Sequence, residues 1–337
     1  MFNYLVVGAG IFGATAARIL ADMGRKVTII ERSNHVAGNC HDRKIEGVNV
    51  SCYGGHIFHT NAAHIWHFVN KYAEWKAYEH RVKANAGGVI YSFPPNRLTA
   101  QQLGISLGDE DAEQVLRRKF FIGYSEKQWG RPYSEIPAAI IKRIPIRDSY
   151  DDRYFADRYQ GVPVEGYTEF IETMLDGLPV ETGADYLKDR GYWDRKAKQV
   201  IYTGAIDQLF DCSLGKLEYR SLTHVTRIMA ADVVGAATMN YCDKEIPYTR
   251  VISWRHIGYQ DGNAWPITWE YPADTGEPYY PVPTDSNIKL YRSYKAMLKR
   301  EAPHVHAGGR LGMYQYLNMD QAVGAAMMLA ARLMKGE

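Results

Sequence analysis

The sequence predicts an α/β fold that begins with a parallel sheet and continues with a small helical insertion and an antiparallel-sheet domain. An apolar run at Leu5–Val7 leads into glycines, and residues 14–23 have helix-forming composition. A second apolar run, at residues 26–30, ends at Glu31 and completes a β-α-β pattern. Beyond Ile144 the chain is rich in Tyr and Pro and carries short alternating runs, which favour antiparallel strands.

The glycines after the first run have the spacing of a dinucleotide-binding turn. Gly8, Gly10 and Gly13 form G-x-G-x-x-G between a predicted strand and a predicted helix. Gly8 permits the tight turn, Gly10 lets a pyrophosphate approach the backbone, and Gly13 allows the helix to pack against the strand. The free N–H groups of the helix N-terminus attract phosphate, and we expect Glu31 to bind the adenosine ribose. The segment therefore predicts a Rossmann-like domain.

Two further segments favour FAD over NAD as the dinucleotide. Glu31-Arg32 is followed by a second glycine-containing turn, Val36–Asn39, which resembles the extension of flavoproteins related to amine oxidases. Far along the chain, Gly308–Gly312 precedes a final amphipathic helix. Two separated segments that converge on one cofactor suit the long FAD molecule, so we expect a Rossmann-like FAD-binding domain.

The middle of the chain predicts helices. Apolar side chains between Ala62 and Trp75 follow helical spacing, with Thr60 or Asn61 available as the cap. Residues 99–121 are polar and charged and have helical composition without a β-rich run. This second stretch predicts a small helical insertion.

Composition excludes several classes of partner. The 337 residues carry 40 Lys plus Arg and 38 Asp plus Glu, so the net charge of +2 gives no strong field for nucleic acid or an anionic membrane. No apolar stretch reaches the about 20 residues that span a bilayer. The four cysteines show no C-x-x-C or metal-ligand spacing, so we expect free thiols, a cytoplasmic protein and no metal site. The 25 Tyr and 7 Trp suit either a site that binds rings and sugars or an aromatic core.

From residue 1 almost to its end, the chain resembles the UDP-galactopyranose mutase family. The resembling stretches follow the family's order: Tyr53–Thr60, Gly123–Gly130, Ile141–Arg147, Tyr150–Phe155, Tyr202–Asp207, Met239–Tyr241, Pro247–Arg250, Pro278–Pro281 and Gly309–Asp320.

The resemblance implies a redox-neutral isomerisation of UDP-galactopyranose to UDP-galactofuranose. The reaction passes through a covalent intermediate between reduced FAD and the sugar, so an external reductant must prime the flavin. Negative charge accumulates on the departing diphosphate, and guanidinium groups must therefore lie beside it.

The resemblance also assigns roles to individual residues. Arg143 matches an arginine on a mobile loop that closes over the diphosphate, and Arg250 matches a second arginine at the same group. His56 matches the histidine near the reactive flavin nitrogen. The other substrate positions are the phenols Tyr154, Tyr294 and Tyr316 at the phosphates, Phe120 and Tyr124 at the uracil, and Ser125 and Trp129 beside the nucleotide.

Cofactor contacts are expected from both glycine turns and from the late segment. Beyond the first turn and Glu31, they are Arg32, Gly38, Asn39, His56, Ile57, Arg310, Leu317, Asn318 and Met319.

Three departures from the family's pattern bear on the site or on the assembly. Asn318 stands where the family usually has Asp, so this position carries no charge. Glu270-Tyr271 is followed by Pro272 and Ala273, so the resemblance supplies no third diphosphate arginine there. The helical insertion is shorter than usual, and because it contributes to the dimer interface of bacterial members, the oligomeric state is left open.

The domain boundaries follow from these patterns. We expect an FAD-binding domain from residues 1–60, 185–220 and 300–337, a shortened helical domain with the mobile loop from 98–145, and an antiparallel-sheet substrate domain from 61–97, 146–184 and 221–299.

Rival interpretations exist for the site and for the function. Arginines such as Arg143 and Arg250 commonly form surface ion pairs, His56 and His59 are also compatible with ordinary packing, and Tyr279-Tyr280 is taken as structural. For the function, the alternatives are the same chemistry on another nucleotide sugar such as UDP-N-acetylgalactosamine, an FAD amine oxidase-like oxidoreductase, and a non-catalytic flavin-dependent binding protein.

Overall fold

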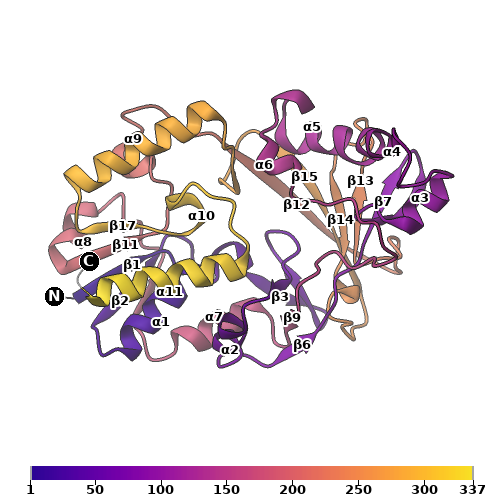
Figure 1. Cartoon of the computed structure of the whole chain (residues 1–337). Helices are drawn as coiled ribbons and strands as arrows, with labels where there is room; N and C mark the ends of the chain where they lie inside the picture. Colours follow the sequence, from indigo (N-terminus) through magenta and orange to yellow (C-terminus); the bar gives the residue numbers. More distant parts are fainter. Residues whose placement is uncertain (1, 336–337) are drawn as a thin grey trace.

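The computed structural model describes residues 2–335, and its first layer is a parallel sheet (Figure 1). Within these residues the sheet has the strand order β10-β2-β1-β11-β17, and each neighbouring pair is parallel. The strands come from distant parts of the chain. They are β1 (Phe2–Val7), β2 (Val27–Glu31), β10 (Val180–Thr182), β11 (Ala197–Tyr202) and β17 (Val305–Ala307).

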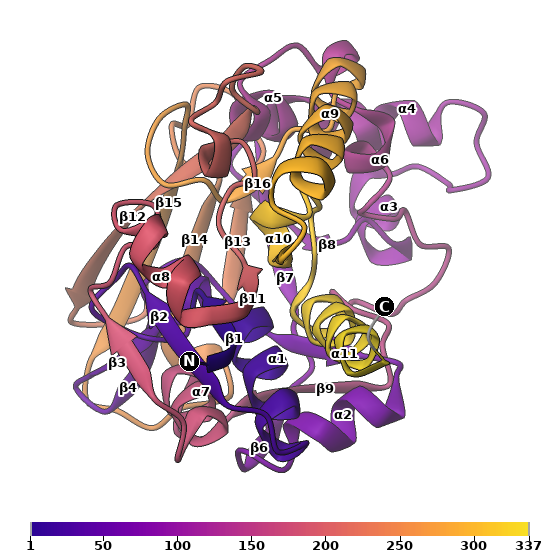
Figure 2. The same ribbon diagram turned by 90° about the vertical axis from the view of Figure 1, so that its left-hand side faces the viewer.

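Helices cover both faces of this sheet. Figure 1 shows the sheet between α9 (Asp285–Glu301) on one side and α1 (Ile11–Asp22) with α11 (Met319–Lys335) on the other, and Figure 2 shows α1 and α11 next to each other. Leu5 belongs to the core under α9, whereas Val6 belongs to the core under α1. Because both faces are buried at the centre of the sheet, β1 ends in the continuous apolar run Leu5–Val7 rather than in an alternating pattern.

The second layer is a larger, mainly antiparallel sheet. Its strand order is β16-β12-β15-β14-β13-β7-β8, and within the described chain β13 and β7 are its parallel pair. The strands are β7 (Val82–Ala86), β8 (Val89–Phe93), β12 (Tyr219–Met229), β13 (Thr238–Tyr241), β14 (Arg250–Ser253), β15 (Trp265–Ala273) and β16 (Tyr280–Pro281).

Short helices follow β8 and form the predicted insertion. They are α3 (Arg97–Leu103), α4 (Ala112–Leu116), a π-helical turn at Arg117–Ile122, α5 (Gly123–Trp129) and α6 (Ala138–Ile141). Leu116, Phe120 and Phe121 pack against β7 and β8 in one apolar cluster. The insertion is therefore anchored to the edge of the antiparallel sheet.

Smaller strands and helices connect the two layers. They are the hairpin β3 (Asp42–Ile45) and β4 (Val48–Ser51), the three-stranded sheet of β5 (Phe58–Thr60), β9 (Tyr159–Pro163) and β6 (Trp75–Ala77), and the helices α2 (Ala63–Val69), α7 (Tyr167–Leu175), α8 (Arg190–Lys196) and α10 (Gly309–Gly312).

The structure differs from the predicted helix between Ala62 and Trp75. Helix α2 ends at Val69, and Trp75 begins β6, which pairs with β9. The indole of Trp75 packs against Phe58 and Trp66, with ring centroids 5.2 and 5.3 Å away. Strand pairing and aromatic packing thus override the helical periodicity of residues 70–75.

The domain assignment also differs at two segments. β10 pairs with β2, and α9 packs on the parallel sheet, although both lie in ranges expected for the substrate domain. Their apolar faces fit the parallel layer, whereas the intervening strands β12 to β16 build the other sheet. Among residues 2–335, no helix is both long enough and apolar enough to cross a membrane.

Candidate active site

The glycine turn after β1 forms an open cradle at the N-terminus of α1. Gly8 has a φ of +104°, and a Cβ there would collide with the Thr203 hydroxyl. A Cβ at Gly13 would collide with the Gly8 carbonyl, so α1 packs directly on the turn. The N-cap residue Gly10 offers no capping side chain, which leaves the first N–H groups of α1 available to a phosphate.

The second glycine turn lies directly against the first. A Cβ at Gly38 would be 3.1 Å from the Cα of Gly10. Glu31 ends β2 beside this junction, where its carboxylate accepts hydrogen bonds from the Ala9 and Ser33 amides at 2.8 Å. Arg32 points outward and pairs with Glu277 at 2.6 Å. The cradle therefore has the shape and free donors that a dinucleotide pyrophosphate needs.

The late glycine segment converges on the same helix. A Cβ at Gly308 would collide with the ring of Phe12 in α1. Arg310, in α10, donates to the Leu317 carbonyl at 2.7 Å and to the Tyr279 carbonyl at 3.3 Å. Segments separated by most of the chain thus meet beside one cradle.

A large cleft of about 460 Å³ lies beside this region, lined by both layers and by the helical insertion. It brings together the following predicted residues: His56, Ile57, Phe120, Tyr124, Ser125, Trp129, Arg143, Tyr154, Arg250, Arg310, Tyr316, Asn318 and Met319.

Arg250 is held rigidly in the cleft by its neighbours. Its guanidinium lies 3.4 Å from the buried carboxylate of Glu270 and donates to the Tyr124 hydroxyl and the Asn240 amide oxygen, both at 3.4 Å. Burial raises the pKa of Glu270, but the charge of Arg250 and the hydrogen bond and charge of His224 together hold that pKa below its ordinary value. Glu270 therefore stays ionised and fixes a positive charge on the cleft wall.

Arg143 reaches the cleft from the loop after α6 and remains exposed. Its guanidinium lies 3.7 Å from the ring centroid of Tyr316 and donates to the Asn318 side chain at 2.9 Å. Tyr316 in turn stacks on Tyr280, with centroids 4.9 Å apart and planes 6° apart. These contacts are easily exchanged for a ligand, because a cation–π contact at an exposed site is worth only about 0.5–1 kcal/mol.

The prediction for Tyr294 is wrong. Tyr294 is fully buried on the face of α9 that packs on the parallel sheet. Its hydroxyl donates to the Gly215 carbonyl at 2.6 Å and accepts from the Leu214 amide at 3.0 Å. Tyr280, which the sequence left as structural, lines the cleft instead, because β16 turns consecutive side chains in opposite directions.

The aromatic residues of the insertion form one end of the cleft. Phe120 is 1% exposed and packs edge-on against Tyr91, so it supports this end from below. Tyr124 and Ser125 line the cleft from α5, and burial raises the pKa of Tyr124 to about 12. Trp129 is buried against Ile136 and Val282. The aromatic rings and the arginines thus stand in one continuous cleft.

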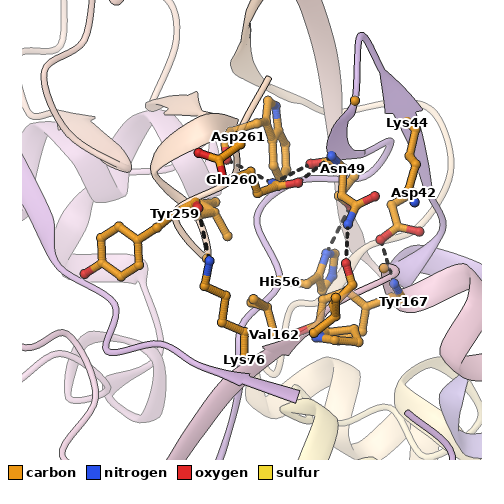
Figure 3. Close-up of a pocket in the computed structure, with 18 residues that line it drawn as sticks. Asp42, Lys44, Asn49, His56, Lys76, Val162, Tyr167, Tyr259, Gln260 and Asp261 are labelled. Atoms are coloured by element: carbon orange, nitrogen blue, oxygen red, sulfur yellow. Dashed lines mark hydrogen bonds between the residues drawn. The ribbon is translucent and has the colours of Figure 1, made fainter. Parts of the chain in front are cut away.

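His56 lines both the large cleft and a smaller cavity of about 220 Å³, and Figure 3 shows it among the residues of the smaller one. Its Nδ1 is 2.8 Å from the Gly54 carbonyl and 3.3 Å from the Ser51 hydroxyl. Burial lowers the pKa of His56 to about 4, so the imidazole is neutral near pH 7. A neutral ring with Nδ1 bound to a carbonyl leaves Nε2 as an acceptor.

Sequence reasoning missed several polar groups of the cleft. Glu270 and Arg147 line it, and so does His59, which the sequence left as compatible with ordinary packing. Their positions in the sequence could have revealed them, because His59 and Arg147 lie inside the resembling stretches and Glu270 directly precedes Tyr271. Within residues 2–335, no group of His, Cys, Asp and Glu is arranged to hold a metal ion.

Comparison with known proteins gives two family matches and several relatives of similar length. Residues 119–316 match the family model described as UDP-galactopyranose mutase, and residues 6–72 match that of an NAD(P)-binding Rossmann-like domain. A dTDP-fucopyranose mutase of Escherichia coli is 35% identical, with 99% of each chain covered. A probable UDP-galactopyranose mutase of Klebsiella pneumoniae is also 35% identical, over 97% of this chain and 94% of that protein.

Solved structures share the fold. A crystal structure of reduced UDP-galactopyranose mutase superposes with a TM-score of 0.78 at 13% identity, covering 100% of this chain and 94% of that one. A redesigned putrescine oxidase gives a TM-score of 0.62 at 13% identity, covering 99% of each chain. The likeness to these structures concerns the fold alone, since the sequence identities are low.

Proposed function

Because the chain belongs to the UDP-galactopyranose mutase family, we propose that it is an isomerase that interconverts UDP-galactopyranose and UDP-galactofuranose. The observation that carries the proposal is the convergence of Arg143 and Arg250 in one cleft, beside the phenols of Tyr124, Tyr154 and Tyr316. Two guanidinium groups and several phenols suit a diphosphate that gains charge as it leaves. The rival interpretation of both arginines as surface ion-pair residues does not account for this shared cleft.

Family membership implies a flavin, and we propose FAD. The two glycine turns and the free N–H groups of α1 would hold its pyrophosphate, Glu31 at the end of β2 would bind the adenosine ribose, and Arg310, Leu317 and Met319 would contact the flavin. Bound and reduced by an external reductant, FAD supplies the nucleophile for the anomeric carbon.

The two arginines hold the substrate in different ways. Arg250, fixed by Glu270, presents a permanent charge to the diphosphate. Arg143 exchanges its contacts with Tyr316 and Asn318 for phosphate oxygens and closes over them. The aromatic end formed by Tyr124 and Trp129 binds the uracil and excludes water.

The sugar remains to be tested, because a relative at 35% identity is a dTDP-fucopyranose mutase. The same cleft chemistry applies to any nucleotide sugar with a departing diphosphate. An amine oxidase-like function is disfavoured because it gives no role to two arginines facing one cleft.

The test is an assay of the FAD-loaded protein after dithionite reduction. UDP-galactofuranose, UDP-N-acetylgalactosamine and dTDP-fucopyranose are supplied separately, and products are separated by liquid chromatography. We expect conversion of UDP-galactofuranose by the reduced protein and none by the oxidised protein. Absence of conversion with every nucleotide sugar, in a protein that has bound flavin, would exclude the proposal.

A further inference from the structure

A histidine–aspartate pair in the wall of the cleft has a geometry suited to proton transfer. His59 lies on β5, and its Nδ1 is 2.7 Å from the Asp157 carboxylate in the segment before β9. Asp157 is fixed by the Asn61 amide, which donates to its other oxygen at 2.5 Å. The imidazole stacks on Phe155, with centroids 3.7 Å apart and planes 12° apart. The Nδ1 atom and one face of the imidazole are therefore held in place by Asp157 and Phe155.

The other nitrogen of His59 is available to a substrate. Both His59 and Asp157 line the large cleft, and Nε2 makes no hydrogen bond to another residue of the described chain. The side chain is 12% exposed, so the protein already shields most of it from water and a bound sugar would cover the rest. An Asp that orients Nδ1 while Nε2 faces the reacting group is the arrangement by which histidine acts as a general acid and base.

The two other histidines that line the described cleft are less suited to this role. Both are neutral near pH 7, because burial lowers the pKa of His56 to about 4 and that of His80 to about 3. His80 also binds the Tyr78 hydroxyl through Nδ1, at 3.1 Å. Neither is hydrogen-bonded to a carboxylate in this structure, whereas His59 is.

Ring contraction of a sugar requires a proton to move between two of its oxygens. When the bond from the anomeric carbon to the ring oxygen breaks, its electron pair passes to that oxygen, which takes up a proton. When the 4-hydroxyl forms the new bond to the anomeric carbon, it gives up a proton. One carbon–oxygen bond breaks and one forms, and neither the redox state nor the proton count changes.

We propose that His59 is the acid–base residue that carries this proton, delivering it to the ring oxygen and recovering it from the 4-hydroxyl, with Asp157 as its positioning residue. The inference rests on the proposed isomerisation. The charged or titratable groups around His59 are Asp157 before β9 and His80 before β7, with Arg250 of β14 beyond His80. The Asp157 carboxylate stabilises the imidazolium that forms when His59 holds the proton.

The test uses FAD-loaded, reduced protein and two reactions. Isomerisation of UDP-galactofuranose requires ring opening, whereas exchange of oxygen-18 between the bridging and non-bridging positions of the β-phosphate in UDP-galactopyranose requires only cleavage at the anomeric carbon. His59→Gln should lower kcat for isomerisation by about 100-fold or more while the oxygen exchange persists. Asp157→Asn should give a smaller loss, about 10-fold, and a shifted pH profile of kcat.

Two controls separate chemistry from structure. His64→Gln changes an exposed histidine on the neighbouring helix α2 and should leave both reactions unchanged. Flavin absorbance and UDP binding should be the same in all variants. A His59→Gln protein that keeps isomerising normally, or that loses oxygen exchange together with isomerisation, overturns the proposal. Failure of the wild type in both reactions contradicts the proposed function instead.

Discussion

The two arginines of the cleft differ in the rigidity of the elements that carry them. Arg250 projects from β14, inside a seven-stranded sheet, and is braced by the buried carboxylate of Glu270. Arg143 projects from a loop after a four-residue helix, and its partners are the half-buried ring and the backbone carbonyl of Tyr316 and the side-chain amide of Asn318. The guanidinium of Arg250 is therefore a fixed part of the fold, whereas that of Arg143 is free to move with the substrate. Substitutions on the two sides should therefore differ in their effects on stability as well as on activity.

Arg250→Ala should have the largest effect, lowering kcat/KM by about 1000-fold because it removes a preorganised charge from the departing diphosphate. It should also destabilise the fold by about 3 kcal/mol, since it leaves Glu270 buried without its partner. Kinetics and thermal unfolding check both effects. Adding Glu270→Gln to this variant should restore stability but not activity; activity that returns with stability would show that Arg250 has only a structural role.

Arg143→Ala should lower kcat/KM by about 100-fold and leave the melting temperature unchanged, because the residue is exposed and its lost contacts are weak. The matched control is Lys142→Ala, the adjacent exposed cation outside the cleft lining, which should retain full activity. Equal losses in the two variants would contradict a specific diphosphate contact.

Lys127→Met should have a smaller effect, because Lys127 contacts the site only through the position of α5. Its ammonium donates to the Tyr241, Ile246 and Tyr248 carbonyls at 2.9, 2.9 and 3.1 Å, and so ties α5 to the segment that leads into Arg250. We expect KM to rise about 10-fold with a smaller change in kcat. The reason is that α5 carries Tyr124, and a shift of α5 should weaken substrate binding by about the free energy of one hydrogen bond. Lys244→Met, which removes an exposed pair with Glu126, is the control and should change little. An unchanged KM in Lys127→Met would show that α5 is fixed by other contacts.

The smallest expected effect is a change in acid stability. Burial raises the pKa of Glu270, but Arg250 and His224 together hold it below its ordinary value of 4.5. The stabilisation is therefore complete above that pH and is lost as the pH falls through the lower folded pKa. Glu270→Gln should therefore flatten the fall in unfolding free energy that accompanies a drop in pH below 4.5. Denaturant titrations at several pH values measure it, and identical slopes in both proteins would mean that Glu270 is not charged in the folded state.

Local patterns in the sequence were enough to predict the first β-α-β unit of the parallel layer and its cradle, but not the later strands β10, β11 and β17, whose stretch of chain favoured antiparallel pairing. The apolar run before Gly8, the spacing to Gly13 and the acidic residue Glu31 are neighbours in the chain, and each has a direct structural cause. The family resemblance assigned Arg143 and Arg250 to the diphosphate, and in the structure both side chains line one cleft.

Other features depended on packing between distant segments. Tyr294 and Tyr280 lie close together in the sequence but have different surroundings. Tyr294 faces the parallel sheet from α9, whereas Tyr280 faces the cleft from β16. Residues 70–75 have helical spacing, but β9 competes for them as a strand partner. The His59–Asp157 pair joins positions 98 residues apart, so no local pattern announces it.

The most direct test of the account is the approach to equilibrium from both directions. Reduced, FAD-loaded protein is incubated with pure UDP-galactopyranose and, separately, with pure UDP-galactofuranose, while the flavin absorbance is followed. Both mixtures should converge on one ratio of the two sugars while the flavin stays reduced. A reaction that consumes the reduced flavin in proportion to product, or mixtures that never converge, would contradict it.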